Sequence, residues 1–207
     1  TALCSFLFIT DYQMTEGRNM RSQLIEEFED CPVIAAIKDE EGLKMCIHSD
    51  IPIVFVLYGD ICNISQIVSR LKKAGKTVII HIDLIAGLSS KEIAVTYIKS
   101  VTHADGIIST RPAVIRQAKE EGLFAIMRFF VIDSMAFESI KRQTESVYPD
   151  MIEVLPGVMP KIIQKICKQN RTPVIAGGLI SDKEDIMAAL DAGAMSISTT
   201  NPKVWFM

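Results

Sequence analysis

The feature that most constrains the fold is an alternation that repeats along the chain from Pro32 onward. Short runs rich in valine and isoleucine alternate with longer segments of helical periodicity, and Gly, Pro, Asp or Ser marks most junctions. The predicted strands are Val33 to Lys38, Ile53 to Leu57, Thr77 to Asp83, Gly106 to Ser109, Ala125 to Phe129, Met151 to Leu155, Val174 to Ala176 and Met195 to Ser198. The predicted helices are Glu40 to Ile47, Ile64 to Ala74, Lys91 to Val101, Pro112 to Glu121, Ser134 to Ser146, Pro160 to Gln169 and Asp182 to Ala192.

This alternation predicts an α/β fold, a single (β/α)8 TIM barrel in which helices surround a closed, parallel, eight-stranded sheet. Several runs are apolar on both faces, as parallel strands covered by helices are. An open, doubly wound sheet is the alternative, although it usually has fewer strands. We expect the ligand-binding barrel over residues 25–207 and an N-terminal extension over residues 1–24. One hypothesis is that Met14 or Met20 is the natural start, so that part of this extension is non-native.

Composition narrows the function classes. The formal charge of −3 and the pI of about 5.7 provide no global positive field for nucleic acid or an anionic membrane, so any RNA contact must be a local patch. The apolar run from Ala2 to Ile9 is too short to span a bilayer. The five cysteines are Cys4, Cys31, Cys46, Cys62 and Cys167. Their number is odd, they are scattered and no two form a CxxC pair, which predicts reduced structural thiols in a cytoplasm and no metal site.

Two junctions near the end of the chain have the composition of phosphate-binding loops. The seventh predicted strand runs into Gly177-Gly178, and the eighth runs into Ser198-Thr199-Thr200-Asn201 before the short segment Pro202 to Phe206. Glycine lets backbone N–H groups approach phosphate oxygens closely, and these loops bind phosphate in many barrels. The alternative is that the two glycines only form a tight turn.

Polar residues end other predicted strands. His81 and Asp83 are two apart, so a continuous strand would turn both side chains to one face, plausibly into the barrel mouth. They would bind ligand hydroxyls, form a proton-transfer dyad or make a buried structural hydrogen bond. Lys38 ends the first predicted strand. It would be a second anion contact, a Schiff-base lysine or a solvated lysine.

Two arginines in this region require partners. Arg111 follows the fourth predicted strand, and Arg128 lies within the apolar fifth. Burying an unpaired guanidinium is costly, so each is expected to meet Asp83, Glu153 or an anionic ligand.

Five ordered motifs resemble one known family. They are Pro32-Val33-Ile34-Ala35-Ala36-Ile37-Lys38, His81-Ile82-Asp83-Leu84, Ile108-Ser109-Thr110-Arg111, Ile152-Glu153-Val154-Leu155-Pro156-Gly157 and Ala176-Gly177-Gly178. Together they resemble the glycerol-3-phosphate-responsive antiterminators over roughly Ile25 to Phe206. The resemblance implies a regulator, not an enzyme, that binds glycerol 3-phosphate or a related phosphorylated metabolite. It acts on leader mRNA of a glycerol uptake or utilisation operon, without a further cofactor.

The resemblance also implies residue roles. Gly177, Gly178 and Thr199 would hold the phosphate, while Asp83, Arg111 and Glu153 would shape the glycerol end. The whole predicted ligand-binding set is Lys38, His81, Asp83, Arg111, Arg128, Glu153, Gly157, Gly177, Gly178, Ser198, Thr199 and Thr200.

Two basic clusters are candidates for RNA binding. One ends the second predicted helix, with Arg70, Lys72, Lys73 and Lys76. The other lies on the sixth, with Lys161, Lys165 and Lys168, and includes Arg171 just after it. Ordinary solvated helix faces are the alternative. An enzyme acting on a sugar phosphate and a sensor that contacts a protein also remain open, as does a homo-oligomer.

Overall fold

The computed structural model describes residues 21–206, and in it eight parallel strands close into a barrel in chain order. β1 pairs with β2 on one side and with β8 on the other, so the sheet has no edge. The strands are β1 Val33–Ile37, β2 Ile53–Val56, β3 Thr77–His81, β4 Gly106–Ser109, β5 Phe124–Phe130, β6 Met151–Leu155, β7 Val174–Gly177 and β8 Ser196–Thr199. The prediction of a (β/α)8 barrel is confirmed, and the open sheet is excluded.

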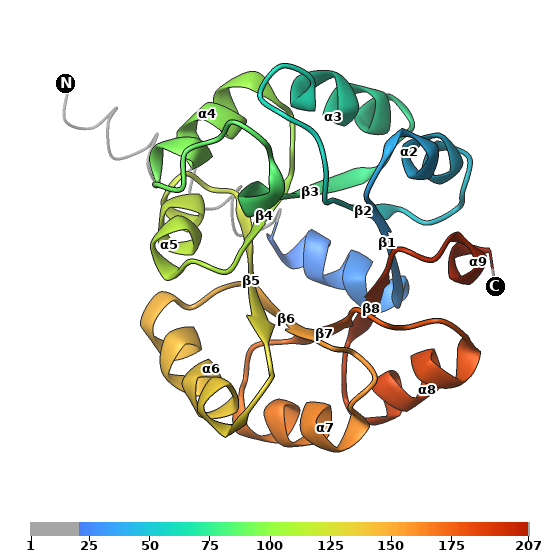
Figure 1. Cartoon of the computed structure of the whole chain (residues 1–207), viewed down its shortest axis with the longest axis vertical. Coiled ribbons are helices and arrows are strands. Elements are labelled where there is room, and N and C mark those ends of the chain that lie inside the picture. The colour runs from blue at the N-terminus through green and yellow to red at the C-terminus, as the bar shows by residue number, and fades with distance from the viewer. Residues whose placement is uncertain (1–20, 207) are drawn as a thin grey trace, which may run out of the picture.

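Helices form a ring around the strands, as Figure 1 shows in a view into the barrel. They are α2 Glu40–Ile47, α3 Ile64–Lys73, α4 Ile93–Val101, α5 Pro112–Glu120, α6 Ser134–Val147, α7 Pro160–Gln169, α8 Lys183–Asp191 and the short α9 Pro202–Trp205. Side-chain caps fix several starts, since Asp39, Asp133 and Asp182 each accept a hydrogen bond from a backbone N–H of the first turn.

A further helix, over residues 21–30, was not predicted. It is drawn in blue in Figure 1 and lies across the centre of the barrel. Its Phe28 is fully buried and stacks on Phe124 at 5.6 Å between ring centroids, with Phe55 at 6.5 Å. Phe124 is the first residue of β5, so the helix closes the end of the barrel where strands begin. Residues 21–24, expected in an extension, therefore belong to this helix, and Met14 and Met20 lie outside the described residues.

The barrel interior is apolar at this closed end and becomes polar toward the other. Ile34, Phe55, Ile79, Ile126 and Ile175 pack with Phe28 inside the sheet. One or more steps further along the same faces lie the buried polar residues His81, Arg128, Glu153 and Ser198. The strand ends therefore form a polar mouth above an apolar plug, which is where ligands bind in this fold.

Within residues 21–206, no helix is long and apolar enough to cross a membrane. No cluster of three or more His, Cys, Asp or Glu residues in that range is arranged to hold a metal ion.

Candidate functional site at the barrel mouth

An ion pair between neighbouring strands is the centre of the mouth. The β5–β6 register sets Arg128 opposite Glu153, and the Arg128 Nε donates to Glu153 Oε2 at 2.6 Å. The Ser198 hydroxyl on β8 donates to the other carboxylate oxygen, Oε1, also at 2.6 Å. The Arg128 and Glu153 side chains are 7% and 1% exposed, so water screens this pair little. The expectation that Arg128 meets Glu153 is confirmed.

Gly177 leaves the space that this network occupies. A Cβ at this position would lie 2.5 Å from the Ser198 Oγ and 2.7 Å from the Glu153 Oε1. Real Cβ atoms do not approach oxygen so closely, so any larger residue would displace the carboxylate or the hydroxyl. Gly177 therefore contributes to the site because it has no side chain.

Asp83 lies differently from its predicted position. β3 ends at His81, and Asp83 belongs to a 3-10 turn, Ile82–Leu84, so strand alternation does not carry it onto the His81 face. Its carboxylate accepts hydrogen bonds from Ser109 Oγ at 3.0 and 3.1 Å, Thr110 N at 2.8 Å and Thr110 Oγ1 at 3.0 Å. Arg111 Nη1 adds an ion pair at 3.0 Å.

Asp83 therefore fastens the loop that follows β4. The predicted pairing of Arg111 with Asp83 is confirmed. The predicted His81–Asp83 dyad, catalytic or structural, is wrong, because His81 is not among the donors to this carboxylate. The reason is local: the chain turns directly after His81, and the β4 loop supplies enough donors to occupy both oxygens.

His81 is a buried group without its full set of partners. Its side chain is 3% exposed, and Nδ1 has no hydrogen-bond partner. Burial and, to a lesser extent, the Arg128 guanidinium lower the pKa of His81 from 6.5 to about 4, against the opposing effect of Asp83. The imidazole is therefore neutral at physiological pH, and its buried Nδ1 is an unsatisfied polar atom within residues 21–206.

The loops after β7 and β8 join the other side of the mouth. Gly178 and Leu179 both have positive φ, 78° and 64°, so the chain turns sharply after β7. The Gly178 carbonyl accepts from Gly157 N at 3.0 Å, which links the β6 and β7 loops. Within residues 21–206, the backbone N–H groups of Gly178 and Thr200 donate to no acceptor. Both are therefore available to an anion.

Thr199 was predicted to hold the phosphate together with Gly177 and Gly178. Its side chain is buried, and its hydroxyl donates to the Ile180 carbonyl at 2.9 Å. The Thr199 carbonyl accepts from the Trp205 indole N–H at 2.9 Å, which seats α9 against β8. In the structure this residue positions the β7 and β8 loops.

The family model described as "Glycerol-3-phosphate responsive antiterminator" matches residues 33–205, the whole barrel from β1 to α9. The chain belongs to this family. Protein YgcP of Escherichia coli K12, whose function is uncharacterized, is 48% identical over 174 residues, which cover 84% of this chain and 91% of YgcP.

Solved structures agree with this antiterminator assignment. A glycerol uptake operon antiterminator regulatory protein from Listeria monocytogenes is 33% identical with a TM-score of 0.82, covering 84% of this chain and 94% of its own. An antiterminator-related protein from Thermotoga maritima is 35% identical with a TM-score of 0.76, covering 86% and 99%. The resemblance inferred from the five motifs is confirmed.

The remaining predicted ligand residues of this antiterminator lie around the same mouth at different depths. Lys38 follows β1 and is exposed, as is Thr200 after β8. Gly157 packs closely on the β7 loop, since a Cβ there would lie 2.9 Å from Ile180 Cδ1 and 3.1 Å from Gly177 N. The mouth thus brings together Arg128, Glu153, Ser198 and Gly177, while Asp83 serves the β4 loop.

The two predicted basic faces of the antiterminator differ in their availability. Lys76 is buried, and its ammonium donates to the Ser49 carbonyl at 2.5 Å and the Ile51 carbonyl at 2.8 Å. Its predicted role in RNA binding is therefore wrong. Lys72 pairs with Asp105 at 2.7 Å, and Arg70 pairs with Glu40 at 2.6 Å, which leaves Lys73 exposed. Tertiary contacts thus neutralise most of the α3 cluster.

The α7 cluster keeps its positive charge. Its members are exposed and form no ion pair with any of residues 21–206: Lys161, Lys165, Lys168 and Arg171. Positions 161, 165 and 168 are four and three apart, so they form a stripe along the solvent side of α7. This stripe is the basic surface available to an anionic partner.

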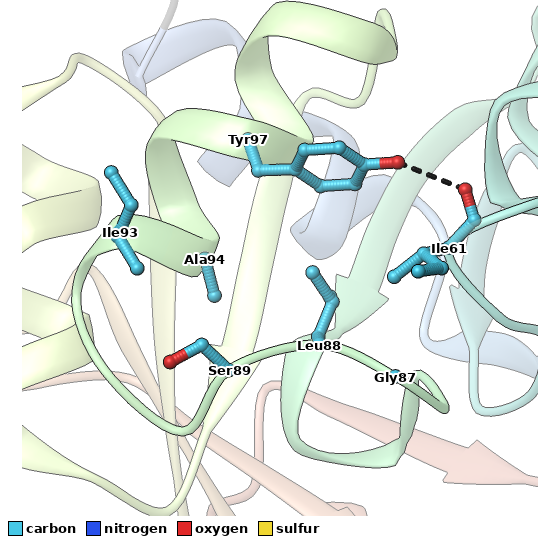
Figure 2. Close-up of a pocket in the computed structure, with 7 residues that line it drawn as sticks. All are labelled: Ile61, Gly87, Leu88, Ser89, Ile93, Ala94 and Tyr97. Atoms are coloured by element: carbon cyan, nitrogen blue, oxygen red, sulfur yellow. Dashed lines mark hydrogen bonds between the residues drawn. The ribbon is translucent and has the colours of Figure 1, made fainter.

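Sequence reasoning missed two surface hollows, neither lined by the polar residues of the mouth. Figure 2 shows the α4 hollow, of about 230 Å³, where Tyr97 donates its hydroxyl to the Ile61 carbonyl; it is lined by Ile61, Gly87, Leu88, Ser89, Ile93, Ala94 and Tyr97. The α6–α7 hollow, of about 360 Å³, is lined by Val131, Ile132, Asp133, Ser134, Phe137, Met159, Ile162 and Lys165. Such hollows depend on packing between helices, which periodicity alone does not specify.

Proposed function

We propose that this chain is a metabolite-responsive transcription antiterminator that binds a small phosphate ester, glycerol 3-phosphate first among candidates, in the barrel mouth. Ligand binding controls its action on leader mRNA of a glycerol uptake or utilisation operon, in the cytoplasm where transcription occurs. Family membership over residues 33–205 supports the regulatory role. The glycerol operon is named for the relatives from Listeria and Thermotoga.

One observation supports the ligand class: a buried arginine has hydrogen-bond donors that no group in the described part of the chain accepts from. Within residues 21–206 the Arg128 guanidinium bonds through Nε to Glu153, which leaves its two Nη groups without protein acceptors. Arginine binds phosphate through paired N–H groups, and a desolvated guanidinium does so strongly. A phosphate ester is the anion that would also use backbone N–H groups, which Gly178 and Thr200 supply at the same mouth.

The remaining polar atoms suit a hydroxylated ligand. Glu153 accepts hydrogen bonds, and the neutral imidazole of His81 offers Nδ1 as either donor or acceptor. A glycerol moiety presents hydroxyls that satisfy both. Under this proposal the phosphate lies toward Arg128 and the β7 and β8 loops, and the hydroxyls lie toward His81 and Glu153.

The alternative of a sugar-phosphate enzyme required His81, Asp83, Glu153 and Lys38 to cooperate. Asp83 instead accepts hydrogen bonds from Ser109 Oγ, Thr110 N and Thr110 Oγ1 and forms an ion pair with Arg111, and Lys38 is exposed on the rim. No observation favours catalysis over binding, so we propose a regulator without catalytic activity.

Transcription in vitro tests the regulatory claim. The template carries the leader of the glycerol operon from the source genome, with its terminator, and the readout is the fraction of transcripts that pass the terminator. We expect the protein to raise that fraction only with glycerol 3-phosphate present, and Arg128→Met to abolish the response. Equal read-through with and without the metabolite would contradict the proposal. The matched control is Arg116→Met, which removes an arginine from α5.

A further inference from the structure

The α6–α7 hollow lies beside the unpaired basic stripe of α7. Lys165 belongs to both, since it lines the hollow and stands between Lys161 and Lys168 on the stripe. The rest of its wall is largely apolar, with Phe137 and Ile162 packed on the core, and it also includes Asp133, whose carboxylate accepts the Ala136 N–H at the start of α6. An apolar slot bordered by unpaired lysines is complementary to an anion that carries a flat apolar group.

Exposed apolar side chains lie in the hollow and directly after its lining residue Ser134. Ile132 lines it and is 83% exposed, while Met135 in the first turn of α6 is 78% exposed. Surface side chains this large and this exposed in one place mark an interaction site more often than a scattered single residue does. The positive stripe then selects the class of partner that fits.

The hollow is also connected to the ligand site. Val131 and Ile132 directly follow β5, which carries Arg128, and Met159 follows β6, which carries Glu153. The Val131 N–H donates to the Leu155 carbonyl at 2.8 Å and ties the two loops together. A ligand that shifts the Arg128–Glu153 pair therefore acts on the two strands whose loops wall the hollow.

We propose that the α6–α7 hollow holds one unpaired base of the target RNA, while Lys161, Lys165 and Lys168 contact its backbone phosphates. This inference rests on the proposed function and names where the RNA binds. Proteins read unpaired RNA bases by stacking them on aromatic and apolar side chains beside basic residues. The hollow, at about 360 Å³, lies at the small end of the roughly 300–1,000 Å³ typical of small-molecule sites, as a single base requires.

Binding of labelled hairpin RNAs taken from the operon leader, measured by fluorescence anisotropy with glycerol 3-phosphate present, tests this inference. One RNA carries a single unpaired adenine in its stem, and a second is the same hairpin fully paired. We expect the wild type to prefer the bulged RNA. Ile132→Ser should lower affinity for it about tenfold with little change for the paired RNA. Lys165→Glu should weaken both and reduce the slope of log affinity against log salt by about one.

The chain offers matched controls. Ile93→Ser removes an exposed isoleucine from the α4 hollow of Figure 2, and Lys183→Glu reverses an exposed lysine on α8; both should bind like the wild type. If Ile132→Ser and Lys165→Glu bind both RNAs as the wild type does, the hollow is not the RNA site and the proposed function stands. No RNA binding by the wild type overturns both. A change in sedimentation mass with Ile132→Ser would assign the hollow to a second copy of the chain and overturn the RNA inference.

Discussion

Acidification should destabilise this protein through a single buried histidine. His81 is 3% exposed, and its pKa is lowered from 6.5 to about 4 by burial and by the Arg128 guanidinium. In the unfolded chain the imidazole takes up a proton as the pH falls below its ordinary pKa, whereas in the native state it stays neutral until about pH 4. The unfolded state therefore binds more protons in that window, and stability falls as the pH falls.

The magnitude follows from the size of the shift. Each pH unit between the two pKa values is worth about 1.4 kcal/mol, so the full loss is roughly 3 kcal/mol, of which about 2 kcal/mol falls between pH 7 and pH 5. Urea unfolding at both pH values measures it. Other groups titrate as well, so the test is the difference between wild type and His81→Gln, which lacks the titrating group.

We expect the wild type to lose about 2 kcal/mol more than His81→Gln over this interval. His48→Gln is the matched control, because His48 is exposed, and it should behave like the wild type. Equal losses in the wild type and His81→Gln would refute the argument that the mouth holds a neutral, desolvated imidazole.

Three further predictions concern the network and its surroundings. Glu153→Gln leaves the buried Arg128 without its counter-ion and should lower the free energy of unfolding by about 3 kcal/mol, measured by denaturant titration; a loss below about 1 kcal/mol would show that water solvates the guanidinium. Gly177→Ala places a Cβ 2.5 Å from the Ser198 Oγ. It should lower the free energy of unfolding by about 2 kcal/mol and weaken glycerol 3-phosphate binding in calorimetry. Unchanged affinity would place the ligand elsewhere. Lys76→Met removes two buried hydrogen bonds and should lower the melting temperature while leaving RNA affinity in a gel-shift assay unchanged, contrary to a direct RNA contact.

The fold was predictable because local signals agreed with the global arrangement. Runs apolar on both faces, separated by helical segments, specify a parallel sheet covered by helices, and α2 and α7 have the predicted bounds. The helix over residues 21–30 was missed because its apolar signal is weak. Only Leu24 and Phe28 are buried there, four residues apart among charged neighbours. Their burial depends on an open barrel end, which no local sequence pattern reveals.

The site was predictable where chemistry forced a partner. An arginine inside an apolar strand needs an anion, and Glu153 on the adjacent strand supplies it. Positions that depend on where the chain turns were less accessible. The spacing of His81 and Asp83 predicted a shared face, but the strand ends between them. Lys76 was predicted to be exposed, because the sequence does not show that the fold brings the carbonyls of Ser49 and Ile51 to its ammonium group.

Calorimetric titration of the purified protein with glycerol 3-phosphate, beside glycerol and inorganic phosphate, tests the central claim most directly. We expect the phosphate ester to bind more tightly than either of its parts. We also expect Arg128→Met and Gly178→Asp each to abolish binding, because they remove the guanidinium or place a negative charge beside the phosphate. Tight binding of glycerol 3-phosphate that survives both substitutions, or no binding by the wild type, would contradict the assignment of the barrel mouth as the sensor site.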